Sequence, residues 1–280
     1  MALDHASDAV AEGDLVFRRE AVHRVQLFRL VLPFDYGTNL MTASTNPYCA
    51  TVLAALLDDR TSCRGFRPEP LPRETIVRLL GHAQRTASWC NAQPWKIHLL
   101  GGAALEQARA TLPDYANGHP AQPDLPWPAA YRGVYLERRR ECGFRLYEAV
   151  GVGRGDRSGA ARQGSENYRF FGAPHVALVT TDRDLGVYGA IDCGAWVSTF
   201  MLAARAAGVA TIAQAALASH PGFWRERLGL GADRLLVCGV SFGYAEENHP
   251  ANAFRTSRAA LADVVQWIDE PTADAQELQP

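Results

Sequence analysis

The feature that most constrains the fold is an apolar run at residues 188–207. It contains only two charged residues, Asp192 and Arg205, and it ends at Gly208. A helix that is apolar nearly all round has to be buried, either in the centre of a protein or in a membrane. Asp192 and the small residues of the run favour a central helix that its neighbours approach closely. A membrane span is the alternative, and we expect no membrane partner.

Predicted strands and helices alternate along the rest of the chain. Strands are predicted at residues 95–100, 175–180, 209–213 and 234–244. Helices are predicted at residues 49–59, 73–85, 137–150 and 222–228. Two segments are expected to lack regular structure, namely the Pro-rich residues 113–133 and the Gly- and Arg-rich residues 151–164. The alternation indicates an α/β or an α+β fold, and the pattern by itself does not choose between them.

The composition narrows the class of partner and the compartment. With 28 Lys and Arg against 30 Asp and Glu, the net charge is -2 and no basic face dominates, so we expect no nucleic-acid partner. The six cysteines include no Cys-x-x-Cys pair, which is typical of reduced proteins and predicts a cytoplasmic location. His and Cys residues do not cluster at the spacing of metal ligands, so no metal is expected.

We expect one domain at residues 41–270, between an extension at residues 1–40 and a tail at residues 271–280. Acidic residues interrupt the start of the extension, and Arg29 interrupts its short apolar run, so it does not match a targeting peptide. Met41 and the residues after it look like an ordinary protein start. The extension is therefore predicted to be poorly ordered, or to come from a misplaced start.

A basic segment, Arg-Thr-Ser-Cys-Arg-Gly-Phe, occupies residues 60–66. If residues 60–64 are extended, Arg60, Ser62 and Arg64 face the same way, because side chains alternate along a strand. Two guanidinium groups and a hydroxyl on one face can receive a phosphate, since Arg pairs bidentately with oxyanions. The alternative is a basic edge that is simply solvated.

A second motif, Ser-Trp-Cys-Asn-Ala-Gln-Pro-Trp, follows at residues 88–95. Together the two motifs resemble the FMN-dependent nitroreductase family, and most closely its nitrobenzoate-reductase-type branch. The resemblance covers residues 49–268. It implies an α+β fold with three layers, α/β/α, around a mixed central sheet. It also implies an intertwined homodimer with the helix at residues 188–207 in its interface.

The resemblance assigns one set of residues to the phosphate, ribityl and pyrimidine parts of FMN. These residues are Arg60, Thr61, Ser62, Arg64, Arg255 and Arg258. Thr61 would contribute its backbone, and Arg64 would lie at the pyrimidine edge, where a cation stabilises the negative charge that reduction places there. The C-terminal pair of arginines departs slightly from the branch, which has a proline near Ala260. An exposed Arg pair is otherwise solvated surface.

A second set is assigned to the flavin ring. It consists of Ser88, Trp89, Asn91, Gln214, Ala215 and Ala216. The first three would reach the flavin of the other subunit. The last three would present backbone N–H groups to flavin N5 and O4, where better-known members have Glu-Gly. Trp89 and Phe171 are also candidates for the substrate pocket, and for both the alternative is packing in the core.

The activity that the resemblance implies is a ping-pong reduction. NADPH or NADH would give hydride to FMN, and a small aromatic acceptor, a nitro compound, would then be reduced in the same place. No catalytic side chain is expected, because flavin N5 carries the chemistry. The same scaffold also serves quinone and enone reductases and dehalogenases, and a flavin-binding module without turnover is a further alternative.

Overall fold

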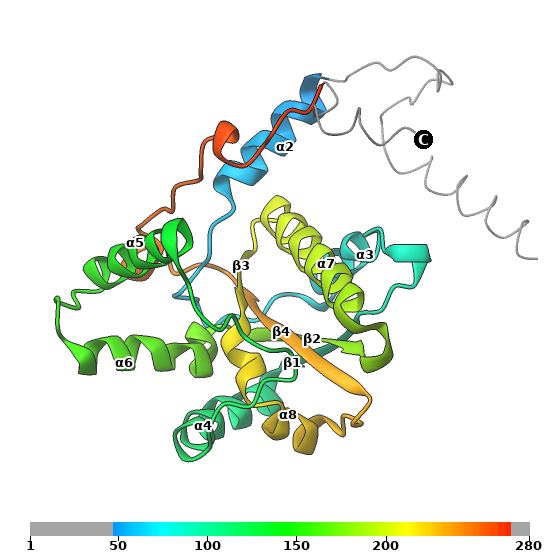
Figure 1. Cartoon of the computed structure of the whole chain (residues 1–280). Coiled ribbons are helices and arrows are strands. Elements are labelled where there is room, and N and C mark those ends of the chain that lie inside the picture. Colours follow the sequence, from blue (N-terminus) through cyan, green and yellow to red (C-terminus); the bar gives the residue numbers. More distant parts are fainter. Residues whose placement is uncertain (1–46, 270–280) are drawn as a thin grey trace, which may run out of the picture. The chain divides into compact units, whose positions relative to one another are not determined.

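The computed structural model describes residues 47–269, and its centre is a four-stranded antiparallel sheet (Figure 1). The strands are β1 (Lys96–Gly101), β2 (His175–Asp182), β3 (Ala210–Gln214) and β4 (Arg234–Gly243). They lie in the order β1-β2-β4-β3, so β2 and β4 are central and β3 is an edge strand. β2 is buried at every position except its last, as its nearly continuous apolar sequence predicts. The predicted extension at residues 1–40 and tail at residues 271–280 lie outside the described residues.

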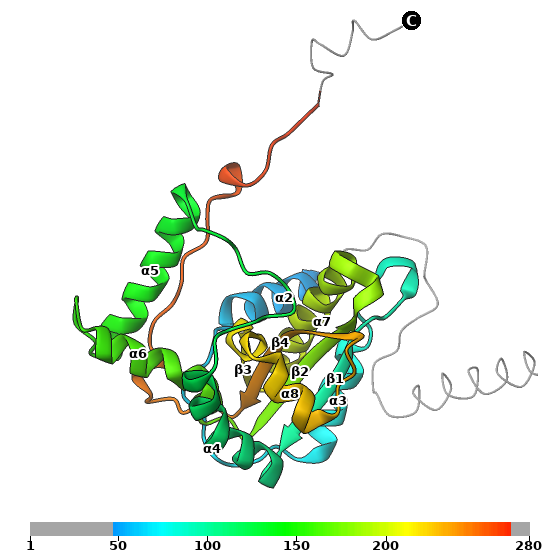
Figure 2. The ribbon, with the colours of Figure 1, turned by 60° about the horizontal axis from the view of Figure 1, so that its bottom comes forward.

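Alternate residues of β2 face opposite sides of the sheet, and each side has its own core. Ala177 and Val179 belong to one core cluster, whereas Val176 and Leu178 belong to the other. The first cluster includes side chains of two helices, α3 (Arg73–Ala83) and α7 (Gly186–Ala206). The second includes side chains of α4 (Gly102–Gly118) and α8 (Pro221–Leu228), which lie on the other face (Figure 2). The predicted three-layer α+β fold is therefore confirmed.

The sheet differs in one detail from the mixed sheet that the sequence predicts. All pairings between the four named strands are antiparallel. Within residues 47–269, the parallel component is a bridge between Ser62 and Thr211 at the β3 edge. The basic segment therefore supplies the parallel part of the sheet.

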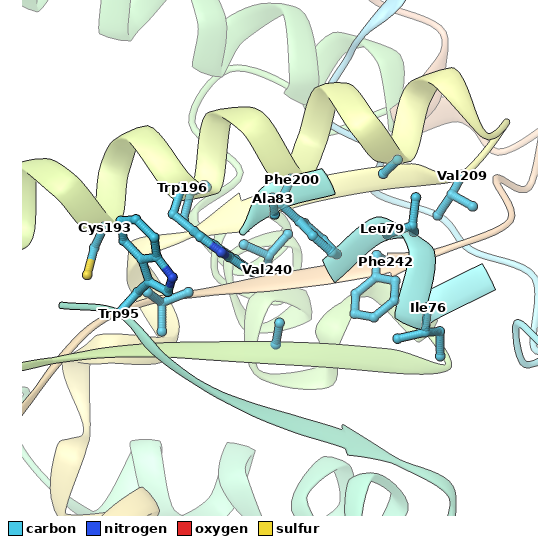
Figure 3. Close-up of a cluster of buried hydrophobic side chains, with 14 of the residues drawn as sticks. Ile76, Leu79, Ala83, Trp95, Cys193, Trp196, Phe200, Val209, Val240 and Phe242 are labelled. Atoms are coloured by element: carbon cyan, nitrogen blue, oxygen red, sulfur yellow. The ribbon is translucent and has the colours of Figure 1, made fainter. Parts of the chain in front are cut away.

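Helix α7 is the long apolar helix of the sequence. It packs one face against the sheet, whereas apolar side chains in its first turns, including Val187 and Ile191, are exposed, so the predicted burial on all sides is confirmed only for that face. Trp196 and Phe200 stack with their ring centroids 5.2 Å apart, and Phe200 meets Phe242 of β4 edge-on at 5.3 Å. Figure 3 shows Cys193, Trp196 and Phe200 on the side of α7 that faces the sheet. By length and composition, residues 183–206 could also cross a membrane, and no other described helix meets that test. The burial of this face against the sheet is the packing that the sequence favours.

The prediction that residues 113–133 lack regular structure is wrong for their first part. Helix α4 continues through Pro113 and ends at Gly118. A proline inside a helix removes one hydrogen bond and crowds the preceding turn. Leu105, Ala108 and Leu112 offset this cost, because they are fully buried in the second core cluster and hold the helix against the sheet.

The prediction of a loop at residues 151–164 is wrong for its second half, where α6 (Arg157–Ser165) lies. Asp156 caps this helix, since its Oδ1 atom accepts hydrogen bonds from the Gly159 N–H (2.8 Å) and the Ser158 hydroxyl (2.9 Å). Asp is a preferred N-cap, so a start signal was present among the Gly and Arg residues. Helices α5 (Gly133–Ala149) and α6 lie to one side of the sheet in Figures 1 and 2. Helix α2 (Pro47–Asp59) has no buried residue.

The connection between α4 and α5 is anchored near its start. The Asp124 carboxylate accepts hydrogen bonds from Arg225 Nη2 (2.8 and 2.9 Å) and from the Leu236 N–H (2.8 Å), and its side chain is only 9% exposed. The Gln122 N–H donates to the Ser219 carbonyl oxygen at 2.9 Å. A carboxylate this buried depends on its partners, so residues 122–124 are fixed to α8 and β4.

His175 of β2 accepts a hydrogen bond from the loop before α3, and protonation of its ring would remove this bond. Its Nε2 atom accepts a hydrogen bond from the Leu71 N–H (2.9 Å), and the residue is 8% exposed. Burial lowers the pKa of His175 below its ordinary value of 6.5. The neutral ring is therefore the form that the fold requires, because a proton on Nε2 would remove the acceptor and bury a charge.

We expect the free energy of unfolding to fall as the pH decreases below about 6.5. In that range the unfolded chain binds a proton at His175 that the folded protein resists, so stability rises with pH. The loss begins near the unfolded pKa and is complete below the folded one. Burial also lowers the pKa of His98 and His220, which add to the same slope.

His175→Gln keeps a side-chain acceptor but does not titrate. Urea unfolding between pH 7.5 and 5.5 should therefore show a flatter pH dependence for this variant than for the wild type. Identical slopes for the two proteins would contradict the role of His175.

Candidate functional site

The basic segment lies in an extended conformation along the edge strand β3. Ser62 forms a parallel bridge with Thr211, and the Cys63 N–H donates to the Thr211 carbonyl oxygen at 3.0 Å. Cys63 is 4% exposed and points into the core, whereas Ser62 is exposed and its neighbours Arg60 and Arg64 are half-buried. The alternation predicted from the sequence is therefore present, with two guanidinium groups and a hydroxyl on the side away from the core.

Four arginines in and near this segment are not paired with a carboxylate in the described part of the chain. Within residues 47–269, none of the ion pairs involves Arg60, Arg64, Arg255 or Arg258. Burial and the nearby positive charge of Arg258 lower the pKa of Arg60, and burial lowers the pKa of Arg64. Cations that are partly desolvated beside one another favour a bound anion, because an anion removes both their repulsion and their unmet solvation.

A cavity of about 350 Å³ lies beside the segment. Its polar lining includes Arg60, Thr61, Thr211, Asn252 and Arg255. The wall also contains three carboxylates, and one of them, Asp59, is already paired with Arg205 at 3.1 Å. Arg258 lines a neighbouring cavity of about 660 Å³ together with residues of α5. The structure thus gathers the two ends of the predicted phosphate site, residues 60–64 and 255–258, in one region.

The second motif forms a strained turn whose conformation several hydrogen bonds fix. Cys90, Asn91 and Gln93 have φ values of 49°, 55° and 47°, in the left-handed region that non-glycine residues rarely adopt. The Ser88 hydroxyl oxygen accepts the Gln93 N–H at 2.9 Å, and the Gln93 amide donates to the Asn91 side chain at 3.1 Å. Such strain costs about 1–3 kcal/mol for each residue and persists only where its surroundings impose it.

Trp89 lies at the start of this turn and stands out from the protein. Its backbone N–H donates to the Asp192 carboxylate of α7 at 3.1 Å, and its ring meets Tyr188 edge-on at 4.2 Å. The residue is 56% exposed, so its ring is not part of the core. No hydrogen bond or ring contact in residues 47–269 links this turn to the cavity beside the basic segment. Within the described part of the chain the two motifs are therefore separate.

The third predicted segment follows β3 directly. Gln214 is 2% exposed and its side chain points inward. Ala215 is exposed and Ala216 half-buried, at the start of the 3-10 helix η4 (Ala215–Ser219). Both side chains are small and add little bulk over the backbone. The contact of this backbone with a flavin ring, which the resemblance implies, stays a prediction.

Comparison with known proteins agrees with this arrangement. The model of the nitroreductase family matches residues 57–244, which is more than half of the chain. The chain belongs to the nitroreductase family.

The alignments with similar proteins of this family span nearly the whole length of those proteins. Nitroreductase NfnB of Mycolicibacterium smegmatis is 34% identical over 232 residues, which are 81% of this chain and 97% of the relative. The 4-nitrobenzoate reductase of Pseudomonas putida is 33% identical over 204 residues, 73% of this chain and 90% of the relative. The crystal structure of the FMN-dependent nitroreductase NfnB from Mycobacterium smegmatis in complex with NADPH aligns with a TM-score of 0.75 at 32% identity, covering 79% of this chain and 99% of that one.

Phe171, the other candidate for the substrate pocket, lies beneath the basic segment of this nitroreductase. It is 6% exposed and belongs to a small core cluster with Cys63, Phe66 and Ile212. Its ring therefore packs against the buried side of the basic segment. Little of the Phe171 side chain is exposed to contact a substrate.

Asn252 links two segments of the candidate site, and the sequence did not predict this role. Its Oδ1 atom accepts the Arg64 N–H at 2.6 Å, and its Nδ2 atom donates to the carbonyl oxygens of Gly65 and Glu246, both at 2.9 Å. The Arg255 Nη1 atom in turn donates to the Asn252 carbonyl oxygen at 2.8 Å. One amide thus joins the basic segment to the C-terminal arginines. A single Asn in an irregular segment carries no sequence signal for such a role.

We expect Asn252→Ala to lower the free energy of unfolding by about 2–3 kcal/mol. The variant leaves the Arg64 N–H without its acceptor and removes one of the donors to the Gly65 carbonyl oxygen, which still accepts the Glu246 N–H. Urea unfolding of the purified protein measures the change. Asn248→Ala, at a nearby exposed position, is the matched control and should stay within about 0.5 kcal/mol of the wild type. Equal stabilities of the two variants would show that Asn252 does not clamp the segment.

Proposed function

We propose that this protein is an FMN-dependent oxidoreductase that transfers hydride from NADPH or NADH to nitroaromatic compounds. The observation that carries the proposal is a group of four arginines that form no ion pair within residues 47–269. Arg60 and Arg255 line the cavity at the β3 edge, Arg258 lines the neighbouring cavity, and Arg64 belongs to the same basic segment as Arg60. A phosphate monoester supplies the negative charge that this group lacks. The relatives named for FMN, NADPH and nitroaromatic substrates support the identity of the ligand and the reaction.

The residues present fit FMN in three ways. Arg60, Arg255 and Arg258 offer guanidinium groups to the phosphate. Arg64, half-buried beside Phe254, can place its guanidinium charge at the pyrimidine edge, where negative charge collects on reduction. The exposed backbone at Ala215 can approach a flat ring closely.

FMN, when bound, takes a hydride from the nicotinamide and passes the electron pair to the acceptor. In the overall balance, a nitro group, NAD(P)H and one proton give a nitroso group, NAD(P)+ and water. A second NAD(P)H and a second proton then reduce the nitroso group to a hydroxylamine. The protein supplies binding, orientation and positive charge, and donor and acceptor use the same place in turn.

The first test follows the visible spectrum of the purified protein without oxygen. We expect bound FMN to bleach on addition of NADPH or NADH and to recover on addition of 4-nitrobenzoate. Bleaching without recovery would still indicate a flavin reductase, but its acceptor would then be a quinone or an enone and not a nitro compound. Bound flavin that neither donor bleaches would indicate a flavin-binding module, and a protein that takes up no FMN would contradict the proposal.

We also propose that the protein is a homodimer in the cytoplasm. Apolar side chains stand exposed on α7 and beside it: Trp89, Val187, Tyr188 and Ile191 are each more than half exposed. A contiguous apolar patch of this kind marks a protein interface. All six cysteines are unpaired, which supports a reducing compartment and can be tested by cell fractionation.

Sedimentation should show a dimer for the wild type and a monomer for Ile191→Asp, because a buried carboxylate would oppose association. Val77→Asp is the matched control: it also places an acid at an exposed apolar position, but on α3, and should remain a dimer. A dimeric Ile191→Asp variant would contradict this interface.

A further inference from the structure

The turn formed by η2 (Glu166–Gly172) contains the second strained segment of the structure. Phe170 and Phe171 are consecutive non-glycine residues with φ values of 60° and 52°. An L side chain in the left-handed region is strained, and two in succession persist only where the surroundings impose them. Such strain indicates that the contacts around the turn hold it in one conformation.

Arg109 of α4 holds the turn in place. One of its terminal nitrogens, Nη1, donates to the Arg169 carbonyl oxygen, and Nη2 donates to the Ala173 carbonyl oxygen at 2.7 Å. Its guanidinium group also lies over the Phe170 ring, 5.5 Å from the centroid. A planar fork that spans both ends of the turn fixes its shape.

The fixed turn touches two of the segments assigned to the cofactor. The Phe66 N–H, at the end of the basic segment, donates to the Phe171 carbonyl oxygen at 3.3 Å. On the other side, Gln214 Nε2 donates to the Asn167 carbonyl oxygen at 3.0 Å and to its side-chain Oδ1 at 3.3 Å. The turn thus connects the C-terminal end of the basic segment to Gln214, the residue just before Ala215 and Ala216.

Both polar atoms of the Gln214 side chain form hydrogen bonds. While Nε2 donates to Asn167, Oε1 accepts the Ser241 hydroxyl of β4 at 2.5 Å. Ser241 is fully buried and Gln214 is 2% exposed. An acceptor on one side and a donor on the other match an amide, which offers one group of each kind. The backbone that follows Gln214 is therefore fixed to both the central sheet and the strained turn.

We propose that Gln214 is a positioning residue that sets the place of the Ala215–Ala216 backbone against the flavin ring. The inference rests on the proposed function, since it names how this chain holds one part of the FMN site. Gln214 does not touch the cofactor with its side chain. It acts by joining β4 and the Asn167–Phe171 turn, so that the phosphate end and the ring end of the site form one rigid unit.

Two variants of Gln214 test this role. Gln214→Met removes both hydrogen bonds, and Gln214→Glu keeps the size but, when ionised, cannot donate to the Asn167 carbonyl oxygen. We expect each variant to bind FMN about tenfold more weakly at pH 8 and, at saturating FMN, to be reduced by NADPH about tenfold more slowly, because a displaced backbone loses its geometry toward the ring.

The pH dependence of Gln214→Glu gives a signature that general damage does not. A protonated Glu can donate to Asn167 and accept from Ser241, as the amide does. Neither of these neighbours titrates. The ratio of the variant's FMN dissociation constant to that of the wild type should therefore fall toward one as the pH is lowered from 8 to 6. If Gln214→Met does not fold, the pH dependence of FMN binding by Gln214→Glu is the test of the positioning role.

Ile76→Val, in the first core cluster and away from both turns, is the control for lost stability alone. It should lower the Tm while leaving the FMN dissociation constant unchanged. Gln214 variants that lower the Tm but bind FMN and react like the wild type would overturn the positioning role and leave the proposed function standing. A wild type that binds no FMN would overturn both.

Discussion

The extended run of residues 60–64 lies against the edge strand β3, where the Cys63 N–H donates to the Thr211 carbonyl oxygen at 3.0 Å. This backbone pairing places the segment without using its basic side chains. Gly65 allows the C-terminal segment to close over it, since a Cβ atom there would lie 2.2 Å from the His249 ring. Asn252 then clamps the two segments together. Main-chain and amide groups thus hold the segment in place. The guanidinium groups of Arg64, Arg255 and Arg258 donate to nearby carbonyl oxygens but form no ion pair within residues 47–269, so their charge can still attract an anion.

The protein holds unfavourable energy in two forms, one at the basic segment and one in two separate turns. One is electrostatic: Arg60 and Arg258 lie close enough for the positive charge of one to lower the pKa of the other. The other is backbone strain in the turns that contain Cys90 and Phe170. A bound anion relieves the first, and binding to the folded state alone raises stability by linkage. The second fixes geometry in advance, which lowers the ordering cost of binding.

Much of the fold could be predicted from the sequence because burial dominates it. The strand at residues 175–180 and the helix at residues 188–207 have apolar patterns that leave few alternatives. Helix α6 was missed because a single capping residue, Asp156, competes with a Gly- and Arg-rich context. The path of α4 through Pro113 was missed because tertiary burial there outweighs a local propensity.

The candidate site could be predicted only in part, for a physical reason. Motif spacing located Arg60 and Arg64, since alternation along an extended chain is a local property. The left-handed conformation of Phe170 is imposed by Arg109 from another helix, so no local pattern encodes it. The inward direction of the Gln214 side chain likewise depends on partners distant in sequence.

The central claim is that the unpaired arginines at the β3 edge bind the phosphate of FMN. The most direct test compares the dissociation constants of FMN and riboflavin, which share the ring and differ in the phosphate. The account predicts that FMN binds at least about 100-fold more tightly, a difference of about 2.7 kcal/mol. Equal affinities would show that the arginines do not hold a phosphate and would contradict the account.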